Sequence, residues 1–250
     1  MVEQMDYDKM ADEIVETLNK IREKPDSIIM ELKKMKNFYK GNEYRNPKFN
    51  FYIMTEEGKA AVDDAIKYLN TIFTNKPFER VKALDDSAKE LVDHLGPEGL
   101  TNAKEKEMSI EVRVKEKVKE PGAIAENISF GWPNAREIVL QMIIDDGVPS
   151  RGHRLNLFNS NYEKIGVSVG KHKTFQCVCV LDFWGKGKKD KLKFEKYEID
   201  KGEWPENAVG LQKHLEAKSE NGKKKILLTY TFSLSDGTTV VKTKSFEEDL

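Results

Sequence analysis

The sequence predicts an α+β protein, because stretches with helical spacing and stretches that alternate like strands follow one another along the chain. Apolar residues recur every three to four positions over residues 8–36, which indicates amphipathic helices. Residues 165–170 instead alternate like a strand, and Cys177 and Cys179 lie on a second apolar strand. With 250 residues, the chain can form one large domain or one domain with a small appendage.

The first half of the chain is expected to be mainly helical. Pro-Asp-Ser at residues 25–27 divides the first helical stretch, and its aspartate or serine can cap the second helix. A further helix is expected over residues 55–73, capped by its first residue. Asp85 or Asp86 is expected to begin the next helix, which carries His94.

Strand and helix patterns alternate in the middle of the chain. Residues 110–114 alternate like a short strand. Asn134 opens a helix that is expected to stop at Asp-Asp-Gly, residues 145–147, where the glycine gives the helix end.

The last quarter of the chain has a different character. Residues 185–190 read as a flexible basic linker. Residues 208–218 are compatible with a helix or a strand, and the pattern favours a strand. Residues 224–234 and 238–245 alternate around Ser-Asp-Gly, which predicts a hairpin. An isolated hairpin is marginal in water, so these strands must pack on the preceding domain or on a partner.

One run of sequence is the most informative feature of the chain. Residues 145–159 read Asp-Asp-Gly-Val-Pro-Ser-Arg-Gly-His-Arg-Leu-Asn-Leu-Phe-Asn. Gly152 lets the backbone pass close to another group, and His153 lies where a side chain can point into a cleft. Together with the Ile-Gly-Val strand at residues 165–170, this run resembles the signature of the CAP superfamily of cysteine-rich secretory, antigen 5 and pathogenesis-related 1 proteins.

Three further motifs follow the order found in that family. Residues 125–128, Ala-Glu-Asn-Ile, resemble its Gly-Glu-Asn-Ile motif, with alanine in place of glycine. Residues 84–94 resemble the helix of its first cavity histidine, and residues 179–184 resemble its closing strand. The resemblance implies a CAP domain over residues 8–186, a three-layer α-β-α sandwich. Residues 187–250 would then form a basic linker and a C-terminal β-hairpin extension.

The resemblance also implies a site. In the CAP fold two histidines meet acidic residues in a shallow cleft, and some relatives hold a divalent metal there. Carried over, His94 and His153 are the candidate ligands and Glu126 is their acidic partner, a set that suits zinc at low occupancy. Asp145 or Asp146 stands in for a second acid. The alternatives are that His94 is a satisfied core histidine and that Glu126 fixes a loop by accepting backbone N–H bonds.

Composition narrows the classes of partner and the compartment. The net charge is −1, and Lys outnumbers Arg 35 to 7, which disfavours a nucleic-acid surface. No apolar run is long enough for a transmembrane segment, and the first residues have no apolar leader. Cys177 and Cys179 share one strand face, where a bridge is awkward, so we expect no disulfide. A cytoplasmic protein is expected; the alternative is an extracellular one whose leader is missing from this numbering.

The motifs favour binding over catalysis. Neither Gly-x-Ser-x-Gly nor His-Glu-x-x-His is present, and no histidine neighbours the cysteines in sequence, so we expect no enzymatic activity. Some relatives bind sterols or other lipids and others act through protein contacts. We therefore expect an intracellular protein-interaction or scaffold component that reaches a protein partner through its C-terminal extension. The alternative is a secreted CAP protein that binds a sterol, another lipid or a divalent metal in its cleft.

Overall fold

The structure of the protein, a computed structural model, describes residues 5–72, 74–132, 134–186, 205–220, 223–235 and 238–249. These residues divide into two units. The first unit contains residues 5–147 and 152–186, and the second contains residues 148–151 and 205–249.

The first unit is built on a four-stranded sheet with the strand order β4-β6-β7-β5. The strands are β4 (Glu79–Arg80), β5 (Ala123–Phe130), β6 (Lys164–His172) and β7 (Gln176–Gly185). β4 runs parallel to β6, whereas β7 is antiparallel to β5 and to β6. Because β7 lies between two strands and two helical layers, it is buried along almost its whole length, as its apolar sequence predicts.

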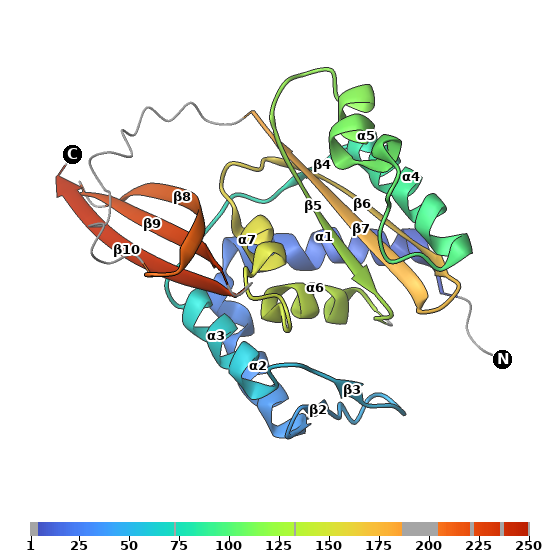
Figure 1. Ribbon diagram of the computed structural model, residues 1–250, viewed down its shortest axis with the longest axis horizontal. Helices are drawn as coiled ribbons and strands as arrows, with labels where there is room; N and C mark the ends of the chain where they lie inside the picture. The colour runs from blue at the N-terminus through green and yellow to red at the C-terminus, as the bar shows by residue number, and fades with distance from the viewer. Residues whose placement is uncertain are drawn as a thin grey trace. The chain divides into compact units, whose positions relative to one another are not determined.

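Helices cover both faces of this sheet (Figure 1). On one face lie α4 (Lys82–Glu98) and α5 (Ile110–Lys117), and on the other lie α1 (Tyr7–Glu23) and α6 (Ala135–Ile144). Alternate residues of β7 separate the two cores: Val178 and Val180 pack with α4, while Cys179 and Leu181 belong to the core of α1 and α6. The expected α-β-α sandwich is therefore confirmed.

The close packing of α4 on the sheet depends on a glycine of β6. A Cβ atom at Gly166 would lie 2.0 Å from the carbonyl carbon of Leu84. Any side chain at this position would push the helix away from the strand, so the Ile-Gly-Val pattern of β6 is a packing requirement of the fold.

The smaller elements of the first unit surround this sandwich. They are α2 (Ile29–Met35), α3 (Lys59–Leu69), α7 (Gly152–Phe158), the short strands β1 (Tyr39–Lys40), β2 (Glu43–Tyr44) and β3 (Ile53–Met54), and 3-10 turns at Pro25–Ile28, Lys36–Phe38 and Lys106–Met108. The three short strands form a sheet of their own, in the order β1-β2-β3.

One segment that was predicted to be a strand forms a helix. Residues 110–114 alternate like a strand, but they form the first turn and a half of α5. Ile110 and Val114 are four residues apart, so they share a helix face and pack with Trp184 in one apolar cluster. The alternation was therefore also compatible with a helix, and packing on Trp184 decided between them.

Two helix starts differ from the expectation, and a third agrees with it. α3 begins at Lys59, after Gly58 turns the chain with φ 59°, so Thr55 is not its cap. α4 begins at Lys82, three residues before Asp85. α6 begins where expected, directly after Asn134, whose side chain accepts a hydrogen bond from the Glu137 N–H at 3.0 Å and so caps the helix.

The end of α6 is formed by an aspartate. Asp145 adopts the left-handed conformation with φ 57°, and its N–H donates to the carbonyl of Gln141 at 2.8 Å. The expected glycine stop at residue 147 lies two residues further on, in the loop. An aspartate tolerates this backbone better than most residues, and this one has further bonds that hold it there.

The second unit contains a three-stranded antiparallel sheet with the order β10-β9-β8. Its strands are β8 (Ala208–Glu220), β9 (Lys223–Leu234) and β10 (Thr239–Asp249). The strand expected over residues 208–218 and the expected pairing of 224–234 with 238–245 are confirmed, and the extension is thus larger than a hairpin. Asp236 and Gly237 of the predicted turn, and the predicted linker from residue 187 onward, lie outside the described residues.

Two further expectations concern the whole chain. Cys177 and Cys179 are both free and buried, so the expected absence of a disulfide is confirmed. In the part of the chain that the structure describes, none of the helices combines the length and the apolar character needed to cross a bilayer.

Candidate functional site

His153 is held by a buried carboxylate. It is the second residue of α7, and its Nδ1 lies 2.6 Å from Oδ1 of Asp145. Asp145 is 0% exposed, whereas the histidine side chain is 27% exposed. Because a carboxylate only accepts hydrogen bonds, Nδ1 carries the proton and Nε2 is the acceptor nitrogen of the neutral ring. The pair therefore fixes the tautomer and the orientation of a partly exposed imidazole.

The neighbouring arginine is a structural residue. Arg154 is 2% exposed, and its guanidinium donates to the carbonyls of Ile143 and Ile144 at 2.5 and 2.7 Å. It also pairs with Asp64 at 2.8 Å. These bonds satisfy the last carbonyls of α6, so Arg154 ties α7 to the end of that helix.

An amide network joins α7 to the edge strand β5. Asn127 donates from Nδ2 to the carbonyl of His153 at 3.0 Å, and Asn156 donates to Oδ1 of Asn127 at 2.9 Å. Asn127 is completely buried. The Glu-Asn-Ile motif and the Gly-His-Arg motif are therefore in direct contact, and the contact is made by the asparagine of the first motif.

Glu126, the residue before Asn127 on β5, points to the other face of the sheet. It lies directly across from Asp182 of β7 in the strand register. The guanidinium of Arg113 from α5, which is 0% exposed, contacts both carboxyl groups. Arg113 pairs closely with Glu126 and lies 3.4 Å from Asp182, and it donates to the carbonyls of Ser87 and Met108. We call Arg113, Glu126 and Asp182 the buried charge cluster.

Two acids share one arginine in this cluster, which affects both their pKa values. Burial and the charge of Asp182 raise the pKa of Glu126 to about 7, against the opposing effect of Arg113. Burial also raises the pKa of Asp182, while Ser87 and Arg113 oppose the shift. The pair therefore holds a proton more readily than two separate carboxylates would.

The structure does not bring the three predicted metal ligands together. His94 is on α4, where its Nε2 lies 3.1 Å from Oε2 of Glu105, and it is partly exposed. Glu126 is occupied by Arg113, and His153 by Asp145. Among the residues that the structure describes, no group of three or more His, Cys, Asp or Glu side chains is placed to hold a metal ion. The residues do not fit a His94–Glu126–His153 zinc site, because each has a different charged partner.

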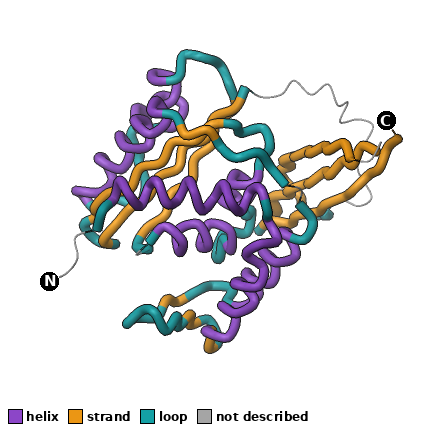
Figure 2. The backbone as a smooth tube through the Cα atoms, turned by 180° about the vertical axis from the view of Figure 1, so that it is seen from behind, coloured by secondary structure: helices purple, strands orange, loops and turns teal. Residues whose placement is uncertain are grey.

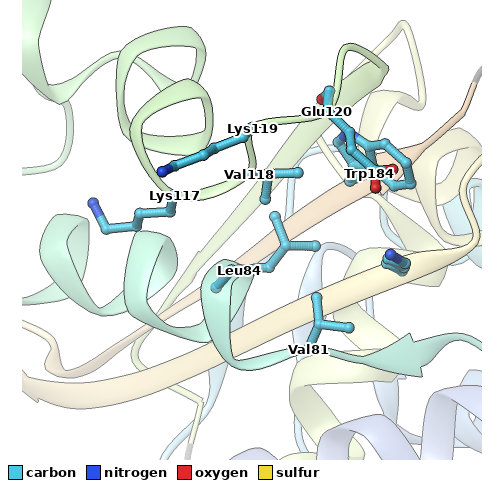
Figure 3. Close-up of a pocket in the computed structure, with 9 residues that line it drawn as sticks. Val81, Leu84, Lys117, Val118, Lys119, Glu120 and Trp184 are labelled. Carbon is cyan, nitrogen blue, oxygen red and sulfur yellow. The ribbon is translucent and has the colours of Figure 1, made fainter.

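Two neighbouring hollows of the first unit are both bordered by Trp184. One, of about 340 Å³, is bordered by the start of α4 and residues 117–120. The other, of about 550 Å³, is bordered by α5 and residues 118–124. Figure 3 shows the apolar side chains of the first hollow directed toward its centre and the lysine ends at its edge; the apolar residues are Val81, Leu84, Val118 and Trp184, and the lysines are Lys117 and Lys119.

Trp184, which borders both hollows, is held in place by its neighbours. Its Nε1 donates to the carbonyl of Glu120 at 3.3 Å, and the ammonium group of Lys164 lies 4.9 Å from the centre of its ring. Lys117 is paired with Glu90 at the same edge. The hollows thus have apolar side chains at their base and both lysines and glutamates at their edges, which suits a ligand with an apolar body and a polar group.

Sequence reasoning located some of these residues and missed others. Asp145 was one of two candidates for the second acid, and it is the acid that holds His153; Asp146 instead accepts the N–H groups of Glu56 and Glu57. Arg113 was missed because its segment was predicted to be a strand. Asp182 lay within a recognised strand motif, and a charged residue in an otherwise apolar strand was the signal that could have identified it.

A three-layer α-β-α domain, whose Glu-Asn and Gly-His-Arg motifs meet at the edge of its sheet, defines the class of protein. The sequence model of the cysteine-rich secretory protein family (CAP) matches residues 40–183. This match covers more than half of the chain, and the chain therefore belongs to the CAP family.

Comparison with other proteins adds little beyond the family. Among solved structures, the chain is similar to an outer surface protein from Borrelia burgdorferi, with 20% identity and a TM-score of 0.38 over 48% of this chain and 83% of that chain. A likeness of this degree says nothing about function. A comparison with curated proteins gave no match.

Proposed function

We propose that this CAP-family chain is a non-enzymatic binding protein, a scaffold component that engages a protein partner through its C-terminal sheet. The observation that supports this most directly is the strand order β10-β9-β8, which leaves a long strand at each edge within the described residues. Unpaired backbone groups along an edge strand are a template for a strand from another chain.

The strand β10 is the edge strand whose side chains the structure describes over most of its length. Val240 and Phe246 pack toward the apolar cluster of β9, whose core residues Ile226 and Phe232 are fully buried. On the alternate face of β10, residues 241, 243, 245 and 247 are exposed, and Val241 is 41% exposed. A β-branched, uncharged position on an edge strand favours pairing with a further strand.

The side chains of the first unit support binding rather than catalysis. The thiols of Cys177 and Cys179 are buried, and burial raises the pKa of both, so neither favours the thiolate form that a nucleophile needs. Asp145 orients His153, but an oriented histidine without a nucleophile beside it does not make a catalytic site. The free thiols also agree with the cytoplasmic location that we propose for the protein.

A photocrosslinking amino acid at Val241 tests this proposal in cells. Phe175 is the matched control, because it is 42% exposed and lies on a turn of the first unit. We expect Val241 to crosslink to an extended segment of one protein, and Phe175 not to. A charged residue at the neighbouring exposed position, Thr243→Lys, should weaken the adduct. Equal adducts from both positions, or none from Val241, would refute the proposal.

A second candidate function is binding of a lipid or a similar apolar acid beside Trp184. The observation in its favour is the pair of hollows with an apolar floor and lysines at the edge. Val118, directly after α5, borders both hollows. Val112, within α5, borders neither and is similarly half-buried, so it serves as the matched control position.

Ligand titration with matched variants tests this candidate. If the pocket binds oleate or cholesterol, Val118→Asp should abolish saturable binding while Val112→Asp should leave it. If neither ligand binds wild type saturably, or if both variants lose it equally, this candidate is refuted.

A further inference from the structure

Exposed apolar side chains are concentrated at one corner of the first unit. Phe51, Tyr52 and Met54 are 46%, 52% and 64% exposed, which makes them half of the large apolar side chains that are exposed among the described residues. They lie in residues 45–54, which we call the aromatic loop. Figures 1 and 2 both show the strands around this loop at the end of the unit away from the four-stranded sheet. A cluster of this kind marks an interaction surface.

The base of the aromatic loop is held by buried contacts. Tyr44 is 2% exposed and packs on Tyr39 with 4.9 Å between the ring centres. The buried Asn46 donates to the hydroxyl of Tyr44 at 3.1 Å and to Glu137 at 3.2 Å. Because these contacts anchor the base of the loop to α6, the exposed apolar side chains of the loop extend from a well-packed part of the fold.

The chain around the aromatic loop is strongly basic. Residues 33–54 contain six lysines or arginines and one glutamate, whereas the whole chain has a net charge of −1. Arg45 is paired with Glu43, and Lys36 with Asp63.

Four cations of this segment remain available. Within the described residues, they have no carboxylate within 4 Å, and all are exposed; they are Lys33, Lys34, Lys40 and Lys48. The aromatic loop and the strands before it therefore carry exposed apolar side chains beside Lys40 and Lys48, which form no ion pair within the described residues, although the charge of Lys48 also acts on Glu137.

This combination fits an anionic bilayer better than a nucleic acid. Aromatic and methionine side chains enter the interface of a bilayer, while lysines beside them attract acidic headgroups. The ring of Phe51 is stacked on Phe49 with centres 5.1 Å apart, and that of Tyr52 is covered by Arg45, so one face of each ring is already occupied. Lysine rather than arginine supplies the free charge, which suits headgroup attraction more than base recognition.

We propose that the aromatic loop docks the protein on anionic membrane surfaces, with Phe51, Tyr52 and Met54 at the interface and Lys40 and Lys48 over the headgroups. This inference concerns the first unit and goes beyond the protein contact proposed for the C-terminal sheet. Both hold independently, and a protein that loses one contact keeps the other.

Vesicle flotation of the full chain tests the proposal with a matched pair of variants. The double variant Lys48→Gln, Phe51→Ser changes the aromatic loop, and Lys173→Gln, Phe175→Ser makes the same changes at the exposed turn between β6 and β7. With vesicles that contain about 30% phosphatidylserine, we expect the first variant to bind roughly tenfold more weakly than wild type and the second to bind like wild type. Circular dichroism checks that both variants are folded.

Three further outcomes decide the proposal. Binding should fall on pure phosphatidylcholine vesicles and at high salt, because the lysines act through headgroup charge. Phe51→Trp should show a blue shift of its emission on anionic vesicles, and Phe175→Trp should not. The proposal is overturned if wild type does not float with anionic vesicles, if both double variants lose binding equally, or if single-stranded RNA competes the protein off them.

Discussion

Asp145 binds His153 through one carboxylate oxygen, at 2.6 Å from Nδ1, and the backbone N–H of Arg154 through the other, at 3.1 Å. The same residue ends α6 with a left-handed backbone. One buried aspartate thus closes a helix, begins α7 and orients the histidine of the Gly-His-Arg motif. The two residues are eight positions apart in the sequence, and this spacing lets the aspartate at the end of α6 reach the histidine in the first turn of α7.

Replacing Asp145 with asparagine tests these contacts without changing the shape of the side chain. Asparagine also tolerates the left-handed backbone, so the substitution mainly removes the negative charge that strengthens the hydrogen bonds to His153 and to the N–H of Arg154. We expect Asp145→Asn to lower the free energy of unfolding by about 2–4 kcal/mol in urea titrations, because the site is fully buried. Asp146→Asn, at the less buried position that follows, should cost less than half as much. Equal losses in the two variants would contradict this assignment.

The buried charge cluster predicts a pH dependence of stability. The pKa of Glu126 is raised to about 7 in the folded chain, above the value of about 4.3 in an unfolded chain, so folding takes up a proton. The stabilisation from this group is fully present below the unfolded pKa and is lost as the pH rises through 7. The free energy of unfolding should therefore fall by about 1–3 kcal/mol between pH 5 and pH 8.

Glu126→Gln should flatten this pH profile, because the titrating group is removed. Glu13→Gln, on the exposed side of α1, is the control and should keep the slope of wild type. A profile that is the same in all three proteins would show that Glu126 does not titrate in this range.

Arg113 is expected to be the most sensitive residue of the cluster. Arg113→Met leaves Glu126 and Asp182 buried without a counter-charge, which should cost about 3–5 kcal/mol at pH 8. The loss should be smaller at pH 5, where a proton replaces the guanidinium. Adding Glu126→Gln to this variant should recover part of the stability at pH 8. Chemical denaturation of the single and double variants measures both effects, and strictly additive losses would contradict the pairing.

The two cysteines should be unreactive until the chain unfolds. Cys177 and Cys179 are buried at 1% and 0% exposure, and burial raises the pKa of each thiol. Titration with a thiol reagent at neutral pH, without reductant, should count no thiols in the native protein and two in denaturant. A count of zero in denaturant would mean that the pair is oxidised.

The fold was predictable because its motifs are local and ordered. The Ile-Gly-Val pattern of β6 encodes the close approach of α4, and Asn134 marks the start of α6. The secondary structure of residues 110–114 was not predictable, because the spacing of their apolar side chains suits both a strand and a helix. Packing on Trp184 decides between the two.

The site was predictable only in part. Asn127 joins the two motifs, yet family motifs directed attention to Glu126 and the histidines. The partner of Glu126 is an arginine that lies 13 residues away on a different element, and no pattern in the sequence links the two. Long-range pairing of charges depends on the packed structure, so the spacing of acids and histidines alone predicted a metal site that the described residues do not form.

The central claim is that a partner adds a strand to the C-terminal sheet. Hydrogen–deuterium exchange, measured on the free protein and on its complex with the crosslinked partner, tests this claim most directly. Backbone amides of β10 that face away from β9 have no strand partner within the described residues, so they should exchange readily in the free protein. The account predicts that these amides become at least about tenfold more protected in the complex, while those of β9 change little. Unchanged exchange along β10, with new protection only in the first unit, would contradict it.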